Sequence, residues 1–498
     1  GRLLIFGTNF GSTQGSGQVL ISGFSAIATT WTNTEIHAYV PEASAIGSVP
    51  VQVITSAGAG NSVMLNVTLR QADGRVLWRF QIDSTFGGEF EAVAPDGTVY
   101  VTDLFRLYAL SSDGGLLWVA VNAGRRRPIS LGADGTIYTA GNLLKALNPD
   151  GTLKWELPNQ DPGLDLRAGP NVGPDGNIYA VQNSLLGGGL GVFSLDPDGN
   201  LLWANEGQEG TGGTASSNSD IVFGTDRLFM GLTGTNNTPI LWSFGLDGNP
   251  LWNGGNNDLS LGSRNFPKLD PSGRVIVGWG QTAIQAITPD GGVDWLSFHP
   301  DGINLPLMPG IDSNGVIYTG PFSSLMLWAI NPDGSTRWTV PASSGLLDAL
   351  NVPPDGSIIL AGGSGGFGQP GRVRAYDTAN GVLLWQVDLL SEGGVNQHVN
   401  SQQPTFTPDS QTAYFTSVFS GNTGISYVYA IRTGDEIVPI PGDINGDGMA
   451  DMNDVPVFAA VLVGTDTDPN HVVASDLNGD GAPDGQDTQP FVGALLGG

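Results

Sequence analysis

The sequence predicts a mainly β protein in three parts: a small β-sandwich, an eight-bladed β-propeller and a small α-helical domain. Two observations support this prediction. A short phrase ending in Trp recurs eight times along the middle of the chain, and an acidic segment with two copies of one loop pattern follows it. At 498 residues the chain is too long for a single core. We expect the three parts to cover residues 1–69, 73–434 and 435–498.

The Trp phrase reads Asp-Gly, three further residues, then Trp, with Asn in place of Asp in the last copy. Its spacing averages about 44 residues, the length of a propeller blade of four strands. Each indole is expected to pack between neighbouring blades, which stabilises the fold by at most about 5 kcal/mol per residue. The eight tryptophans are Trp78, Trp118, Trp155, Trp203, Trp252, Trp295, Trp338 and Trp385.

A second phrase, Pro-Asp-Gly-x-x-Tyr or a looser variant, lies between successive Trp phrases and also occurs eight times. Its clearest copies end at Tyr100, Tyr138 and Tyr179. Asp-Gly supplies the positive-φ residue of a tight hairpin, and the alternating run after it supplies the next strand. The first Trp phrase has no preceding strands of its own, whereas the last set, residues 404–431, has no Trp phrase after it. The strand at 76–78 is therefore expected to complete the last blade and close the ring.

Residues 1–69 contain short runs that alternate apolar and polar residues, at 18–21, 35–40 and 49–54, which is typical of strands. The stretches 7–11, 31–36 and 47–53 resemble an IPT/TIG domain, an immunoglobulin-like sandwich. That family has a further strand before the stretch that matches 7–11. Either this strand lies upstream of residue 1, or the sandwich has an open edge that can pair with a strand from another chain.

The segment from residue 435 contains two loops of one pattern, 33 residues apart. Each loop places oxygen ligands at positions 1, 3, 5, 9 and 12, has Gly at position 6, and offers a backbone carbonyl at position 7. This pattern predicts two Ca²⁺ sites; the alternative is a solvated acidic tail. The predicted ligands are Asp443, Asn445, Asp447, Met449, Asp451 and Asp454 in the first loop, and Asp476, Asn478, Asp480, Ala482, Asp484 and Asp487 in the second.

An apolar, helix-like run follows each loop, at 455–463 and 491–496. This EF-hand-like doublet, with Asp instead of Glu at position 12, resembles a type I dockerin. The resemblance implies calcium binding and docking to a cohesin domain. Position 8 of the loops departs from the family, because Ala450 and Pro483 stand where an aliphatic residue is usual. The loop residues therefore support the implied calcium binding, whereas the implied cohesin partner rests on the family resemblance alone.

The composition narrows the possible functions. Lys and Arg number 19 against 47 Asp and Glu, so the net charge of −28 disfavours nucleic acid and anionic membranes as partners. There are no cysteines, and we find no apolar run long enough for membrane insertion. A secreted protein stabilised by calcium instead of disulfides fits this composition.

The stretch 375–385 resembles the PQQ-like repeat family, which includes quinoprotein dehydrogenases and non-catalytic outer-membrane assembly scaffolds. The enzymes hold their quinone under a vicinal cysteine pair, so the absence of cysteine predicts no bound PQQ. Other catalytic signs are weak: 111–118 half-resembles a sialidase Asp-box, and 125–127 is an arginine run typical of a solvated loop. The histidines, which show no metal-ligand spacing, are His37, His299, His398 and His471.

We therefore expect a non-enzymatic extracellular assembly or adhesion protein, located at a cell surface or in a filament, whose calcium module contacts other protein subunits. Two alternatives remain open. The chain is an adaptor docked to a cohesin-like domain, or its propeller binds a glycan or acts as an enzyme. The second alternative predicts a concave polar pocket near the propeller axis.

Overall fold

The computed structural model describes most of the chain. The described residues are 2–41, 43–67, 75–83, 90–103, 105–123, 128–140, 144–157, 166–183, 190–206, 221–233, 239–253, 267–279, 283–300, 309–320, 326–341, 349–363, 371–389, 391–392, 395–399, 403–419, 426–434, 442–445, 450–466, 469–478 and 482–497.

The N-terminal domain is a sandwich of six strands in the order β1-β4-β3-β2-β5-β6. Alternating residues such as Val19, Ile21 and Ile36 form its core, as the period-two pattern predicted. Strands β1 and β6 end the order, and a groove of about 410 Å³ runs between them, lined by Phe6, Val53 and others. The strands are β1 (Arg2–Phe6), β2 (Gln18–Ile21), β3 (Phe24–Trp31), β4 (Glu35–Tyr39), β5 (Gly47–Thr55) and β6 (Gly58–Val67).

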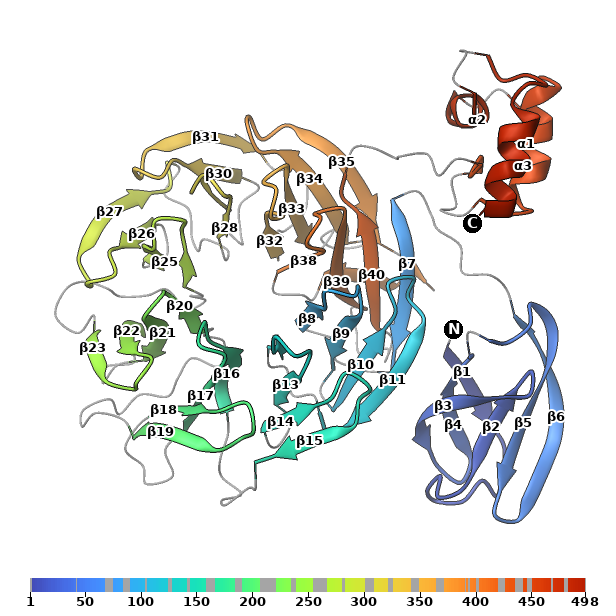
Figure 1. Cartoon of the computed structure of the whole chain (residues 1–498), viewed down its shortest axis with the longest axis horizontal. Coiled ribbons are helices and arrows are strands. Elements are labelled where there is room, and N and C mark those ends of the chain that lie inside the picture. Colours follow the sequence, from blue (N-terminus) through green and yellow to red (C-terminus); the bar gives the residue numbers. More distant parts are fainter. Residues whose placement is uncertain are drawn as a thin grey trace.

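The repeat region forms a ring of antiparallel sheets with a propeller-like arrangement (Figure 1). In the part of the chain that the structure describes, seven of these sheets have four strands each. Each sheet is one continuous stretch of sequence, and the first of its strands lies innermost.

The first four sheets cover residues 90–253. They are β8 (Phe90–Val93), β9 (Val99–Thr102), β10 (Arg106–Leu110) and β11 (Leu116–Val121); β12 (Ser130–Leu131), β13 (Ile137–Ala140), β14 (Leu144–Leu147) and β15 (Leu153–Glu156); β16 (Leu166–Val172), β17 (Ile178–Asn183), β18 (Leu190–Leu195) and β19 (Leu201–Glu206); and β20 (Ile221–Phe223), β21 (Arg227–Thr233), β22 (Pro239–Gly245) and β23 (Pro250–Asn253).

The next three sheets cover residues 268–388. They are β24 (Lys268–Leu269), β25 (Val275–Trp279), β26 (Ala283–Ile287) and β27 (Val293–Phe298); β28 (Gly310–Ile311), β29 (Ile317–Thr319), β30 (Met326–Ile330) and β31 (Thr336–Pro341); and β32 (Ala349–Asn351), β33 (Ile358–Gly363), β34 (Arg372–Asp377) and β35 (Leu383–Asp388).

The remaining sheet joins the two ends of the repeat region. Its strands are β36 (Ser391–Glu392), β37 (Val395–Val399), β38 (Thr405–Phe406), β39 (Thr412–Phe419), β40 (Ser426–Arg432) and β7 (Val76–Ile82). Strand β7 pairs with β40, with Trp78 opposite Ala430. The Arg75 guanidinium also lies 4.5 Å from the Trp385 ring centroid in the preceding sheet. The prediction that the first Trp strand completes the last sheet is confirmed.

In the described residues, seven of the repeated tryptophans, from Trp78 to Trp338, pack under the Asp-Gly or Asn-Gly turn of the next sheet. A Cβ on Gly151 would lie 2.6 Å from the Trp118 ring, and one on Gly334 would lie 2.6 Å from Trp295. The indole N–H also donates to a carbonyl in that turn, as from Trp118 to Pro149 O at 2.9 Å. The turn glycine is therefore required both for its positive φ and for its close approach to the ring.

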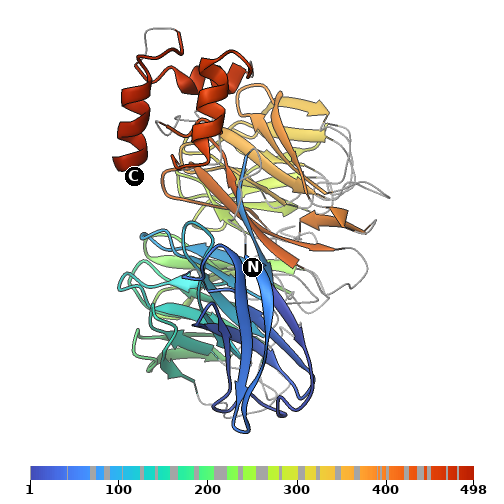
Figure 2. The same cartoon turned by 90° about the vertical axis from the view of Figure 1, so that its right-hand side faces the viewer.

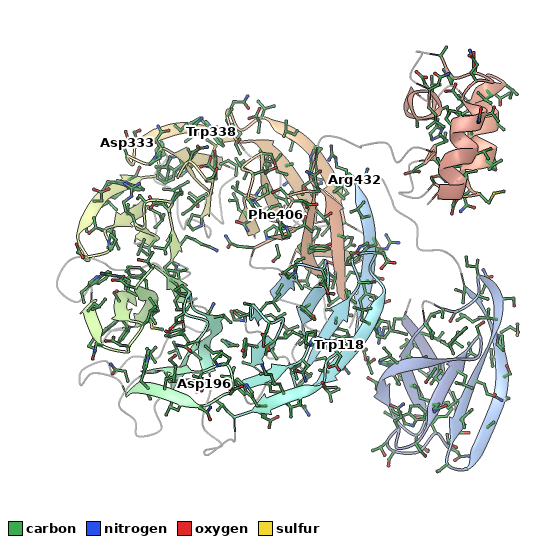
Figure 3. The ribbon with its side chains drawn as sticks, viewed as in Figure 1. Trp118, Asp196, Asp333, Trp338, Phe406 and Arg432 are labelled. Atoms are coloured by element: carbon green, nitrogen blue, oxygen red, sulfur yellow. The ribbon has the colours of Figure 1, made fainter. Side chains whose placement is uncertain are left out.

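The two phrases also meet within one sheet. Tyr100 packs against Trp118 with ring centroids 5.8 Å apart, and Tyr138 against Trp155 at 6.0 Å. Figure 3 shows Trp118 and Trp338 on outer strands, whereas Phe406 lies toward the inside of the ring. Most of these indoles are half-buried at the rim, while Trp78, beside the N-terminal domain, is only 3% exposed. The energy of about 5 kcal/mol is thus an upper limit that few of them reach.

The C-terminal segment contains three helices in its described part: α1 (Asp454–Leu462), α2 (Pro469–Ser475) and α3 (Thr488–Gly497). Helices α1 and α3 match the predicted apolar runs, whereas α2 was not predicted. Phe458 and Phe491, which stand 33 residues apart as the loops do, stack at 4.1 Å and form its small core with Ile444. We call residues 442–497 the C-terminal module; Figures 1 and 2 show its helices outside the ring. In the described residues no helix is long and apolar enough to cross a membrane.

Candidate functional site

The two acidic loops of the C-terminal module have the same internal hydrogen bonds. In the first, the Asp454 carboxylate accepts the backbone N–H groups of Ile444, Asn445 and Asp451 at 2.8, 2.9 and 2.8 Å. These are loop positions 2, 3 and 9, and Asp454 is position 12. The position-12 acid therefore ties the start of the loop to its end.

The second loop repeats this geometry. Asp487 accepts the N–H groups of Leu477, Asn478 and Asp484 at 2.8, 2.9 and 2.8 Å. Both position-12 acids are fully buried. Burial opposes ionisation of Asp487, but its backbone donors outweigh burial and hold the pKa of that carboxyl below its ordinary value. Asp487 thus remains anionic, as a calcium ligand must.

The structure places part of each predicted ligand set. Asp443, Asn445 and Asp451 of the first loop, and Asp476, Asn478, Ala482 and Asp484 of the second, belong to the described residues. Asp447, Met449 and Asp480 lie outside them. Asp451 and Asp484 each accept the N–H two residues on, at 2.7 Å. Among the described residues alone, no group of three or more His, Cys, Asp or Glu residues has metal-holding geometry. The donor set is entirely oxygen, which fits a hard cation such as Ca²⁺.

A second constellation, which the sequence did not predict, joins the N-terminal domain to the ring. Asp83, at the end of β7, accepts from Arg2 at 2.5 Å and from the hydroxyls of Thr29 and Thr30 at 3.0 and 2.9 Å. Arg106 from β10 lies 3.4 Å from the same carboxylate. The side chains of Arg2 and Asp83 are 8% and 7% exposed, so this ion cluster is almost dry. Burial of Asp83 opposes its charge, but Arg2, Arg106 and His37 together lower its pKa.

The ion cluster extends on both sides of Asp83. His37 Nδ1 lies 2.8 Å from Asp83, and its Nε2 lies 2.7 Å from Glu35. On the ring side, Tyr108 donates to buried Asp103 at 3.1 Å. Burial raises the pKa of Asp103. Next to these groups, Tyr39 of the sandwich stacks on Phe80 of the ring at 4.8 Å. We call Arg2, His37, Asp83 and Arg106 the junction cluster.

A polar pocket of about 620 Å³ lies at the inner edge of the ring. Its lining comes from the inner strands β24, β28, β32 and β38 and from the turns that follow them, and includes Lys268, Asn351, Gln403 and Phe406. The second alternative from the sequence, a ligand-binding propeller, predicted a pocket of this kind, but no motif had pointed to these residues.

Among the described side chains, the other residues considered from the sequence do not gather into a site. His299 stands edge-on to Trp328 at 5.2 Å, and His471 Nδ1 lies 2.7 Å from Asp466. His398 pairs with Val418 in the β37–β39 ladder. The arginine run reaches from 125 to 127, and these positions fall outside the described residues. The Asp-box-like stretch is an ordinary turn, in which Gly114 N–H donates to Ser111 O at 2.9 Å.

Comparison with known proteins identifies the repeats. The family model described as outer membrane protein assembly factor BamB matches residues 65–231 and 240–480, which is more than half of the chain. The chain belongs to this family. The model of the IPT/TIG domain matches residues 1–70. Both assignments agree with the resemblances drawn from the sequence, although the BamB match continues into the helical C-terminal module.

Solved structures support the fold alone. The "Dos1 propeller" has a TM-score of 0.52 at 12% identity, covering 73% of this chain and 95% of that one. Virginiamycin B lyase from Staphylococcus aureus has a TM-score of 0.41 at 12% identity, covering 71% and 99%, which is too distant for any argument about function. No curated protein matches the chain.

Proposed function

We propose that this BamB-family chain is a secreted, non-enzymatic assembly protein whose C-terminal module binds two Ca²⁺ ions and then contacts other protein subunits. The observation that carries the proposal is the duplicated loop geometry around Asp454 and Asp487. Both loops have the same three backbone hydrogen bonds to position 12. Both also place oxygen donors at the spacing that Ca²⁺ requires, which favours two equivalent ion sites. The doublet is dockerin-like, and a cohesin-like domain is therefore the alternative partner to a second copy of the chain.

We also infer that the ring is an eight-bladed propeller, with β7 as the outer strand of its last blade. Eight Trp phrases, seven four-stranded sheets in the described residues, and the sheet closed by β7 support this count. A closed ring leaves no sheet edge for pairing, so it serves as a rigid platform between the sandwich and the calcium module.

Calorimetry of the full chain with Ca²⁺ and with chelator tests the ion sites. We expect an additional C-terminal unfolding transition whose midpoint rises with Ca²⁺. The double variant Asp443→Asn/Asp476→Asn removes the charge at position 1 of both loops and should abolish that response. The matched control Asp196→Asn/Asp333→Asn makes the same charge change in two exposed ring turns and should leave the response intact. A transition that ignores Ca²⁺ would overturn the proposal.

Sedimentation and electron microscopy of the same samples separate the possible partners. Chains that associate with Ca²⁺ and dissociate with chelator indicate self-assembly. Chains that stay monomeric but bind an added cohesin domain indicate an adaptor. Chains that do neither, despite bound Ca²⁺, contradict the assembly function while leaving the ion sites standing.

A further inference from the structure

The pocket at the inner edge of the ring is asymmetric, although the sequence repeats are not. Its lining, in the part of the chain that the structure describes, comes from four consecutive sheets, from β24 to β38. Repeat packing explains features that every sheet shares. The side chains that line this pocket differ from sheet to sheet, which makes the pocket a candidate for a specific role.

A hydrogen-bond pattern links neighbouring inner strands at three places, and two of its donors, Asn351 and Thr405, line the pocket. The donor in this pattern is a side chain that stands two residues before the turn after an inner strand. The acceptor is a backbone carbonyl of the next sheet, three residues before the corresponding turn. Ser130 donates to Pro170 O at 2.8 Å, Asn351 to Pro404 O at 2.9 Å, and Thr405 to Glu91 O at 3.1 Å. The inner edge of the ring is therefore held together by polar side chains.

Three equivalent inner-strand positions, Ala92, Val222 and Gly310, have no side chain that can donate, and Gly310 is the one next to the pocket. Gln403 takes its place: its Nε2 donates to Leu350 O at 3.0 Å and makes a longer contact with Pro309 O at 3.4 Å. A Cβ at Gly310 would lie 2.9 Å from Val352, so a larger residue does not fit there. Gln403 thus reaches from β38 to the carbonyls of two other sheets at the edge of the pocket, and its amide plane is fixed by the backbone.

Fixed amides beside an aromatic ring are suited to a polyhydroxylated ligand. The nitrogens of Asn351 and Gln403 are bonded to backbone carbonyls, which leaves the amide oxygens as acceptors for ligand hydroxyls. Phe406 is only partly buried against a core shared by the last two sheets, and it lines the pocket. An apolar ring face of this kind packs against the C–H face of a sugar. Lys268 adds a cationic donor at the far side.

The charge around the pocket disfavours an acidic ligand, although Lys268 is among the lining residues. Asp270 is 5% exposed and pairs with Arg274 at 2.6 Å, and Asp312 accepts Tyr318 OH at 3.0 Å, so both lining carboxylates already have partners. The pocket opens at the end of the sheets that carries the Asp-Gly turns, and the chain has a net charge of −28. An anion that entered there would be repelled by this field. We infer that this pocket binds a neutral saccharide, with Phe406 as its stacking platform and Asn351 and Gln403 as its polar contacts.

Titration of the full chain with neutral gluco-, manno- and galacto-hexasaccharides tests the inference, which does not rest on the calcium sites. We expect saturable binding of at least one at a Kd of about 1 mM or below, and about ten-fold weaker binding by Phe406→Leu. Phe223 occupies the corresponding position of inner strand β20, directly before the turn, and is not among the lining residues, so Phe223→Leu is the matched control and should bind as the parent chain does.

Two other results would overturn the inference. One is that no neutral hexasaccharide binds, or that an acidic oligogalacturonate binds better. The other is that binding survives both Phe406→Leu and Lys268→Met. Methionine keeps most of the length of the lysine side chain but lacks its charge. Lys268→Met therefore provides a separate test if circular dichroism shows that Phe406→Leu disturbs folding.

Discussion

The N-terminal domain and the C-terminal module flank the same ring but are ordered by different interactions. The sandwich is attached through the junction cluster, in which Asp83 of the ring meets Arg2 of the sandwich in an almost dry interface. The bonds that shape the C-terminal module instead run within it, from Asp454 and Asp487 to their own loops. The first attachment needs a partner domain to complete its charges, whereas the C-terminal module, on the function proposed above, needs an ion.

Removal of Ca²⁺ should have the largest effect, and this effect should be confined to the C-terminal module. If free Ca²⁺ stands at about 1,000 times Kd, its loss costs the module about 4 kcal/mol of stability. Hydrogen exchange at the amides of Ile444 and Leu477 should accelerate with chelator, because those N–H groups are bound only in the ordered loops. Amides of the sandwich should be unchanged; equal acceleration in both would remove the distinction.

The substitution Asp83→Asn should loosen the sandwich and leave the C-terminal module unaffected. Without that charge, Arg2 remains in a buried interface without its counter-ion and Arg106 keeps only Asp103, which costs about 3 kcal/mol. Small-angle scattering should detect a more mobile N-terminal domain. Asp96→Asn, in an exposed ring turn, is the control for charge alone. A variant that scatters as the parent does would show that the Tyr39–Phe80 stack suffices to hold the domain.

The ring that both ends share can be tested with a pair of glycines. Gly151 and Gly176 have nearly equal φ values of 82° and 81°, but only Gly151 has an indole within 4 Å of its Cβ position. Gly176→Ala should cost about 1 kcal/mol from backbone strain. Gly151→Ala should cost about 2 kcal/mol, because the clash with Trp118 adds to the same strain. Denaturant unfolding of both variants measures the difference, and equal losses would contradict the role assigned to Trp packing.

The smallest expected effect is that of acid on the junction cluster. Because the pKa of Asp83 is lowered, its contribution is complete above the ordinary carboxyl pKa of about 3.9 and is lost as pH falls through the folded value. Asp103 acts in the opposite direction, since its raised pKa favours the folded interface in acid. The sandwich should therefore stay attached down to about pH 4 in scattering experiments. Because its pKa is raised, Asp103 is already neutral where Asp83 is protonated, so Asp103→Asn should leave the pH of release unchanged.

The repeated parts of the molecule were predictable because their signals are local. Asp-Gly turns, strand alternation and the spacing of Trp118 and its equivalents act within one or two sheets, so periodicity alone predicted the ring and the pairing of β7 with β40. The helices after the two acidic loops followed from apolar runs in the same way. Helix α2 was not predicted, because its sequence, PNHVVAS, contains few apolar residues and no strong period.

The sequence by itself determined the order of the parts, the strand that completes the ring sheet and the pair of oxygen-rich loops. Only the tertiary structure showed that Arg2 meets Asp83 across 81 positions, and that Gln403 takes the place of the donor absent at Gly310. The reason is physical: a repeat or loop is specified by neighbours along the chain. A buried charge cluster or a one-sided pocket depends on isolated side chains that converge only after folding.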